Sequence, residues 1–254
     1  EGIAVHLALA FMHFSKFGSI PMKHNILKLI VLLFLLQISV AAQTVYPFQN
    51  TTLSDDERLD NLLSLMTIDE KVDALSTHLG VPRLGIKNTG HSEGLHGMAL
   101  GGPGNWGGFD VGTRTPRTYP TTTFPQAYGL GETWDTELIR KVADIEATEV
   151  RFYTQNPKFQ KGGMVMRAPN ADLARDPRWG RTEESYGEDE FLGSRMTVAF
   201  IEGLQGNDPR YWKSASLMKH FLANSNEDGR DSTSSDFDER LFREYYSFPF
   251  YKGI

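Results

Sequence analysis

Residues 135–168 read DTELIRKVADIEATEVRFYTQNPKFQKGGMVMRA, and the order of patterns in this stretch decides the fold class. Helical spacing from Asp135 to Asn156 predicts a helix that carries Leu138, Val142, Ile145 and Phe152 on one side. Gly162 and Gly163 then lead into a short apolar segment, Met164 to Ala168, which predicts a buried strand. The stretch is therefore a helix followed by a strand.

The same order recurs downstream. Asp189 to Leu204 is predicted to be a helix with Leu192, Met196 and Phe200 on its core side, followed by a strand from Ala215 to Phe221 and a last helix from about Asp238 to Tyr246. Helices that alternate with short strands, each followed by a polar loop, indicate an α/β fold with a parallel sheet. We favour a (β/α)₈ barrel, whose loops after the strands form the active-site face. A doubly wound sheet is the alternative, but it usually has shorter loops and a phosphate-binding turn.

Two capping boxes lie upstream, one formed by Ser54 with Glu57 and one by Thr67 with Glu70. Each opens a helix with an apolar stripe, and we expect both stripes to face the core. The stripes consist of Leu59, Leu62, Leu63 and Met66 in the first helix, and of Val72, Leu75 and Leu79 in the second.

Composition excludes several classes of protein. The 254 residues include no cysteine, which removes disulfide frameworks, thiolate metal sites and cysteine nucleophiles. The 26 Lys and Arg residues against 32 Asp and Glu residues leave a net charge of −6, and there is no long basic run, so nucleic acid is not an expected partner.

The first 42 residues differ from the rest of the chain. They carry +2, which leaves −8 on residues 43–254. Residues 22–42 have a basic start, an apolar centre and two small residues at the end, from Met22 to Ala42, as in a secretory signal peptide. A membrane anchor is the alternative, but the apolar centre is shorter than the roughly 20 residues that a spanning helix needs. We expect residues 1–21 to be upstream read-through, and a periplasmic or secreted protein after the signal is removed.

A Gly-rich loop at 101–108 contains a literal G-x-G-x-x-G match at residues 102–107. No apolar strand precedes this match, Pro103 removes a backbone N–H, and no helix follows to receive a pyrophosphate. The loop is better interpreted as a surface excursion beside a site, and no cofactor is expected.

Polar residues gather where the predicted strands end. Glu93 follows the first strand, Arg181 follows the second, and Lys219 and His220 lie inside the third. Burying a lysine and a histidine together is costly unless they are hydrogen-bonded, so the pair indicates a site. Charged partners suit the many hydroxyls of a sugar, and Trp106 or Trp179 could stack on its apolar face.

Two other interpretations stay open. His91, Glu93 and His96 are clustered enough for a metal-dependent hydrolase, although the segment is not H-E-x-x-H and does not have a helical pattern. Residues 175–184 could equally form a solvated, salt-bridged loop without chemistry.

Five motifs resemble the N-terminal part of glycoside hydrolase family 3, the β-glucosidase and β-xylosidase family. In order they are LLSLMT (62–67, with Glu70-Lys71), SEGLHG (92–97), TFPQ (123–126), RDPRWGRTEESYGED (175–189) and KHF (219–221). The match covers residues 53–254, and its segment 175–189 is the most specific. The resemblance implies a (β/α)₈ barrel followed by an α/β sandwich.

The resemblance also implies retaining, exo-acting hydrolysis of β-linked sugars, with Glu93, Arg181, Lys219 and His220 as ligands of the terminal ring. The family's Asp nucleophile lies in a Ser-Asp-Trp-like motif that this chain lacks, and its acid/base carboxylate usually comes from the second domain. We therefore expect residues 43–254 to form a partial barrel that is truncated before the later strands, with no catalytic carboxylate of its own and no activity in isolation.

Glu93 stands where many β-glucosidases of the family have Asp. Glutamate is one methylene longer and leaves less room near C6, so we favour a β-xylosidase, whose pentose substrate lacks C6. A β-glucosidase of the same family and a catalytically silent sugar-binding protein remain the alternatives. The sequence predicts an oligosaccharide or β-glycoside as partner and gives no oligomeric state.

Overall fold

The computed structural model describes residues 45–76, 80–100, 120–160 and 162–254. The predicted signal peptide, the Gly-rich loop and Trp106 lie outside these residues. None of the helices in the described part combines the length and apolar character needed to cross a bilayer.

The chain divides into two compact units, residues 1–66 and residues 67–254. The described part of the first unit contains the 3₁₀ turn η2 (Pro47–Gln49) and helix α3 (Asp55–Leu65). The predicted capping box is confirmed, since Ser54 accepts from the Glu57 backbone N–H and Glu57 accepts from the Ser54 backbone N–H. The predicted core stripe is wrong, because α3 has no buried residue and Leu59 and Leu63 are exposed.

The second unit begins with α4 (Ile68–Ala74), whose predicted capping box of Thr67 and Glu70 is also confirmed. Val72 and Leu75 are exposed, so this stripe faces no core in the described structure either, and Leu79 lies outside the described residues. The 3₁₀ turn η3 (Pro82–Leu84) follows and buries Leu84.

A parallel three-stranded sheet lies at the centre of the second unit, in the order β1 (His91–Glu93), β2 (Val165–Arg167), β3 (Ala215–Ser216). Helices α5 (Ala127–Gly131) and α6 (Thr136–Gln155) connect β1 to β2, and η4 (Thr182–Glu184) and α7 (Glu190–Gln205) connect β2 to β3. The chain ends in α8 (Glu239–Leu241), the π-helical turn η5 (Phe242–Tyr246) and α9 (Phe248–Gly253). The expected α/β class with a parallel sheet is confirmed in this part of the chain.

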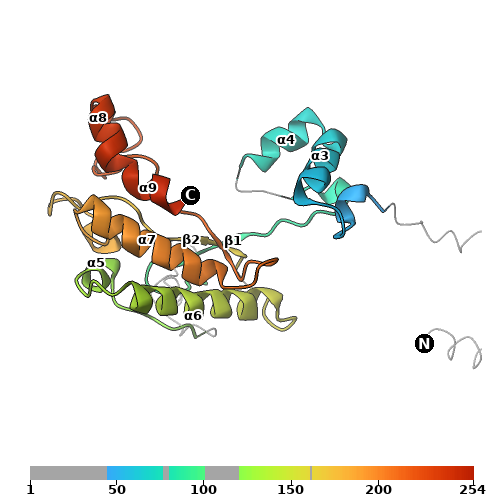
Figure 1. The fold of residues 1–254 in the computed structure, drawn as a ribbon, viewed down its shortest axis with the longest axis horizontal. Coiled ribbons are helices and arrows are strands. Elements are labelled where there is room, and N and C mark those ends of the chain that lie inside the picture. Colours follow the sequence, from blue (N-terminus) through green and yellow to red (C-terminus); the bar gives the residue numbers. More distant parts are fainter. Residues whose placement is uncertain (1–44, 77–79, 101–119, 161) are drawn as a thin grey trace, which may run out of the picture. The chain divides into compact units, whose positions relative to one another are not determined.

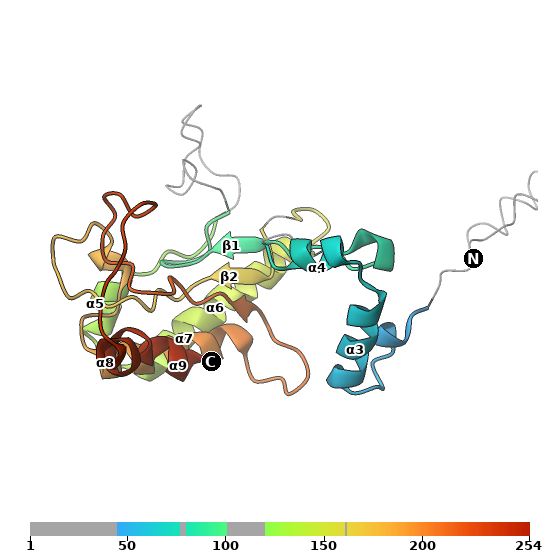
Figure 2. The ribbon, with the colours of Figure 1, turned by 90° about the horizontal axis from the view of Figure 1, so that it is seen from above.

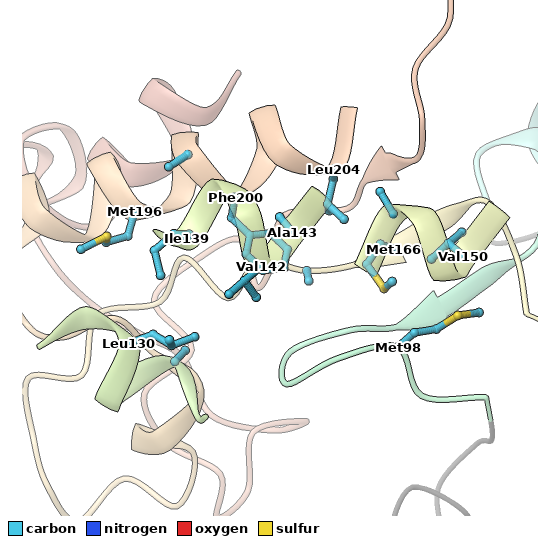
Figure 3. Close-up of a cluster of buried hydrophobic side chains, with 14 of the residues drawn as sticks. Met98, Leu130, Ile139, Val142, Ala143, Val150, Met166, Met196, Phe200 and Leu204 are labelled. Carbon is cyan, nitrogen blue, oxygen red and sulfur yellow. The ribbon is translucent and has the colours of Figure 1, made fainter. Parts of the chain in front are cut away.

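Helices α6 and α7 lie side by side along one face of the sheet (Figures 1 and 2). Figure 3 shows how side chains of both helices meet Met166 of β2 and Met98. Strand alternation explains this arrangement, since Met166 points to the helices while Val165 and Arg167 take the other face. The face away from the helices therefore carries the polar strand ends.

The ends of α6 are as expected, but of the four side chains expected on its buried side only Val142 is buried. Asp135 caps the helix and Asn156 ends it. Leu138, Ile145 and Phe152 are exposed, whereas the buried positions are Ile139, Val142, Ala143, Glu146, Ala147, Val150 and Tyr153. The expected core residues of α7 are confirmed for Met196 and Phe200, and Leu192 packs against the same cluster.

Two strands also differ from the expectation. The first strand is formed by His91, Ser92 and Glu93 themselves, so Glu93 ends the strand instead of following it. The third is two residues long, and Lys219 and His220 lie beyond it. The chain still runs beside β2, because the Leu217 N–H donates to Met166 O and the Lys219 N–H donates to Pro169 O.

Candidate sugar-binding site

A cavity of about 970 Å³ opens where the three strands end. Its walls come from the residues after each strand and from the segment that precedes α5. They include Glu93 to Ala99, Thr121 to Thr123, Arg167, Arg181, Glu184, Leu217, Lys219, His220 and Arg230. Because strand ends of a parallel sheet meet at one edge, segments far apart in sequence line a single cavity here.

Glu93 lies between two cations. Lys219 Nζ is 3.0 Å from one carboxylate oxygen and Arg167 NH1 is 3.2 Å from the other. Burial raises the pKa of Glu93, but hydrogen bonds and charge from Lys219 and then Arg167 outweigh burial and bring it below its ordinary value. The carboxylate is therefore ionised at neutral pH and acts only as an acceptor.

Arg181, the residue before η4, is held by the side chains of Glu184 and His220. Its Nε is 3.0 Å from Glu184 Oε1, its NH2 donates to Glu184 Oε2, and its NH1 is 3.1 Å from His220 Nε2. Burial lowers the pKa of Arg181, yet the charges of Glu184, Glu227 and Asp172 raise it overall. The guanidinium is thus a fixed cation beside the cavity.

His220 connects Arg181 to a buried carboxylate. Its Nδ1 is 2.8 Å from Asp172 Oδ2, and the Asp172 side chain is 1 % exposed. Arginine has donors only, so the His220 Nε2 accepts from Arg181 and Nδ1 carries the hydrogen that Asp172 accepts. Burial raises the pKa of Asp172, and hydrogen bonds from His220 together with the charge of Arg181 offset this only in part.

The segment of the cavity lining before α5, residues 121–123, is hydrogen-bonded to α6. Glu149 accepts from the Thr122 N–H at 2.9 Å and from the Thr122 hydroxyl at 2.7 Å. The Phe124 N–H donates to His96 O, which joins this segment to the loop after β1. A Cβ on Gly97 would lie 2.0 Å from Thr122 O, so only glycine allows the two backbones to approach so closely. Burial lowers the pKa of His96, which also lines the cavity, and the charges of Glu184 and Glu183 offset this only in part.

Glu93, Arg181, Lys219 and His220 all line this one cavity. Trp179 does not line it; the ring is buried and its Nε1 donates to Glu227 at 3.1 Å, so the expected stacking role for Trp179 is wrong. Sequence reasoning passed over Arg167 and Asp172 as site residues. Arg167 ends a strand and Asp172 lies in the polar segment after it, so both positions could have indicated site residues.

The two other interpretations can be compared with these contacts. Among the described residues no group of three His, Asp or Glu side chains is arranged to hold a metal ion, and Glu93 is paired with cations instead. The interpretation as a solvated, salt-bridged loop is correct for only part of residues 175–184. Arg178 and Asp176 form an exposed pair, while Arg181 and Glu184 are mostly buried.

The chain is similar in sequence and structure to proteins of known family. The model of the glycosyl hydrolase family 3 N-terminal domain matches residues 110–254. A xylan 1,4-β-xylosidase of Xylanibacter ruminicola is 37% identical over 221 residues, covering 82% of this chain and 24% of that protein. The chain thus spans about a quarter of the length of that relative.

Two solved structures are similar as well. A family 3 exo-β-xylosidase in complex with a xylobiose aziridine activity-based probe has a TM-score of 0.64 and 29% identity, covering 82% of this chain and 26% of that one. β-Glucosidase 3B from Thermotoga neapolitana in complex with α-D-glucose has a TM-score of 0.60 and 27% identity, covering 77% and 27%. The family match extends over more than half of the residues, and the chain belongs to glycosyl hydrolase family 3.

Proposed function

We propose that the protein acts as an exo-acting, retaining β-glycosidase of the β-xylosidase type, in which Glu93, Arg181, Lys219 and His220 hold the terminal sugar. One observation carries the proposal: these four side chains line one cavity, where Glu93 pairs with Lys219 and Arg181 is hydrogen-bonded to His220. The names of the related xylosidases support the same substrate class.

The chemistry of the cavity suits a sugar. The ionised Glu93 accepts hydrogen bonds from hydroxyls, and Lys219 and Arg181 donate to hydroxyl oxygens. Charged hydrogen bonds are about twice as strong as neutral ones and are directional, so they can hold a ring in one orientation. Because these ion pairs already hold Glu93, Lys219 and Arg181 in place, little side-chain entropy remains to be lost on binding.

The wider organisation is part of the same proposal. Residues 43–254 contribute to the N-terminal part of a (β/α)₈ barrel, and residues 22–42 direct export to the periplasm or the exterior. Retaining hydrolysis needs two carboxyl groups about 5 Å apart. We assign neither the nucleophile nor the acid/base to a residue of this chain.

Pentose is preferred over hexose for a steric reason. Glu93 reaches one methylene further into the cavity than an aspartate would, and its pairing with Lys219 and Arg167 keeps it there. A β-glucosidase is the second candidate, favoured by the likeness to the glucose complex. The ratio of kcat/KM on 4-nitrophenyl β-D-xyloside and β-D-glucoside separates the two.

The test of the proposal is substitution in the full gene product. Arg181→Ala and Lys219→Ala each remove one partner of a part-buried charge pair, a loss of about 2–5 kcal/mol, or roughly 30-fold to several thousand-fold in kcat/KM on the xyloside. Arg178→Ala and Lys141→Ala are the matched controls, since both side chains are exposed. Near-normal activity in Arg181→Ala or Lys219→Ala, with the circular dichroism spectrum unchanged, would refute the proposal.

Two other outcomes would replace it. Binding of xylose without hydrolysis would identify a silent sugar-binding protein. Activity that a chelator abolishes and a divalent ion restores would identify a metal-dependent hydrolase.

A further inference from the structure

Glu93 and Arg167 are register partners on neighbouring strands. Each is the last residue of its strand, and their Cα atoms pair directly in the parallel ladder between β1 and β2. Side chains of register partners point to the same face of a sheet. Here that face is the one opposite Met166, so both side chains belong to the cavity side.

The two cations on Glu93 have different roles in this geometry. Lys219, from the segment after β3, donates to Glu93 Oε2. Arg167, from the central strand β2, donates to Glu93 Oε1. A glutamate with a single partner can still rotate about its terminal bonds. With a cation on each oxygen, from two different segments, the carboxylate is fixed in both position and orientation.

Partial burial strengthens the ion pair between Glu93 and Arg167. The side chains of Glu93 and Arg167 are 23% and 32% exposed, so their attraction is screened less than that of a surface pair. Lys219 is needed for the sugar as well, and because its ammonium group has three N–H donors, it can bond to a sugar hydroxyl and to Glu93 at once, so that its charge is shared between the two. Arg167 then becomes the contact that keeps Glu93 extended into the cavity.

We propose that Arg167 is a positioning residue of the sugar site: it holds the carboxylate of Glu93 extended and ready to accept hydroxyl hydrogen bonds while Lys219 is engaged by the sugar. The inference rests on the proposed function and adds a residue that does not itself have to touch the sugar. It predicts that Arg167 acts on substrate binding, and only through Glu93.

The test compares Arg167→Met, Arg167→Lys and Glu93→Gln, singly and combined, in the full gene product. Arg167→Met keeps the stem and removes the donor, so we expect KM on 4-nitrophenyl β-D-xyloside to rise about tenfold, with kcat changed less than threefold; tenfold is about 1.4 kcal/mol, the size expected of a charged hydrogen bond. Arg167→Lys should restore part of the loss because it keeps the charge. Arg178→Met, an exposed arginine paired outside the cavity, is the control and should leave KM unchanged.

The variant that combines Arg167→Met with Glu93→Gln tests whether Arg167 acts through Glu93. In the Glu93→Gln background, Arg167→Met should add less than a twofold effect, since the ion pair is already lost. An unchanged KM in Arg167→Met, or a full tenfold effect retained in Glu93→Gln, would overturn the inference. Absence of both hydrolysis and binding in the unaltered protein would instead refute the proposed function, and if xylose binds without turnover the same cycle is measured on Kd.

Discussion

Asp172 Oδ2 lies 2.8 Å from His220 Nδ1, and the opposite nitrogen of that ring lies 3.1 Å from Arg181 NH1. The buried carboxylate therefore contributes, through the imidazole between them, to the orientation of a cavity arginine that Glu184 also holds. Asp172 is not among the described residues that line the cavity, so it acts on a ligand only through His220 and Arg181.

Substitution of Asp172 should weaken the site in a graded way. Asp172→Asn keeps an oxygen that can accept from His220 Nδ1, whereas Asp172→Leu leaves that donor without a partner, a cost of about 1–3 kcal/mol. We expect kcat/KM on the xyloside to fall severalfold in the first variant and about 5- to 150-fold in the second. Asp176→Leu, which alters an exposed aspartate of the same loop, is the control. Equal activity of the two Asp172 variants would contradict the relay.

Glu146 should make stability depend on pH. The side chain is fully buried in α6, and neither carboxylate oxygen makes a hydrogen bond of ordinary geometry. Burial and then the charge of Glu149 raise the pKa of Glu146 well above its usual range, which the backbone of Gly97 offsets only in part. A raised folded-state pKa stabilises the protein fully below the unfolded value of 4.5, and this contribution is lost as the pH rises toward the folded-state pKa.

Glu146→Leu should remove that dependence. At pH 7 we expect the free energy of unfolding to increase by about 1–2 kcal/mol, because an unpaired buried polar group is replaced by an apolar one. Urea denaturation between pH 5 and pH 8 should show the gap between variant and wild type widening with pH. Glu137→Leu, on the exposed side of the same helix, should show no such trend. A constant gap would mean that Glu146 does not titrate in this way.

Gly163 should tolerate no side chain. A Cβ there would lie 1.9 Å from Gly90 C and 2.1 Å from His91 N, so it would push β1 away from β2. We expect Gly163→Ala to cost about 3 kcal/mol or more, or to prevent folding. Gly129→Ala is the matched control, since a Cβ at that helical position meets no atom within 4 Å and alanine favours helix by about 0.5–1 kcal/mol. Thermal unfolding of the two variants measures the contrast, and similar midpoints would argue against the close approach.

Glu70 should titrate in strongly acidic solution. Hydrogen bonds from Arg83 and from the Thr67 backbone lower its pKa to about 2. A depressed pKa stabilises the fold above the unfolded value of 4.5, and this contribution disappears as the pH falls through about 2. Carbon-detected NMR should place the Glu70 midpoint near 2, and Arg83→Met should move it upward toward 4.5. A midpoint that stays in place without Arg83 would show that the backbone cap alone is responsible.

Helix boundaries were predictable from the sequence where a polar cap defines them, but helix faces were less so. Asp135, Asp189 and Asp238 each accept from a backbone N–H at the start of a helix, as their residue type suggests. Apart from Val142, the buried side of α6 was missed because it carries Ala143 and Ala147, which contribute little to an apolar pattern. Their small size is what packing requires: a Cβ on Gly203 of α7 would lie 2.7 Å from Ala143 Cβ.

The residues of the site were more predictable from the sequence than the contacts between them. Glu93, Arg181, Lys219 and His220 could be named because charged residues gather after the predicted strands and because all four match the family's sugar ligands. The contact between Glu93 and Arg167 depends on the register between β1 and β2, which hydrophobic patterns do not determine in strands of three residues. Asp172 was passed over because an aspartate in a polar run has the same pattern whether it is solvated or buried.

The ion pair between Glu93 and Lys219 joins residues 126 positions apart. Loop closure over such a separation is slow compared with the formation of local helices, so the pairing of α6 with α7 can precede it. During synthesis, which adds about 5–20 residues per second, Glu93 leaves the ribosome roughly 6–25 s before Lys219 does. The part of the cavity that this ion pair forms can therefore assemble only after Lys219 has left the ribosome, whereas α6 and α7 are already synthesised before that point.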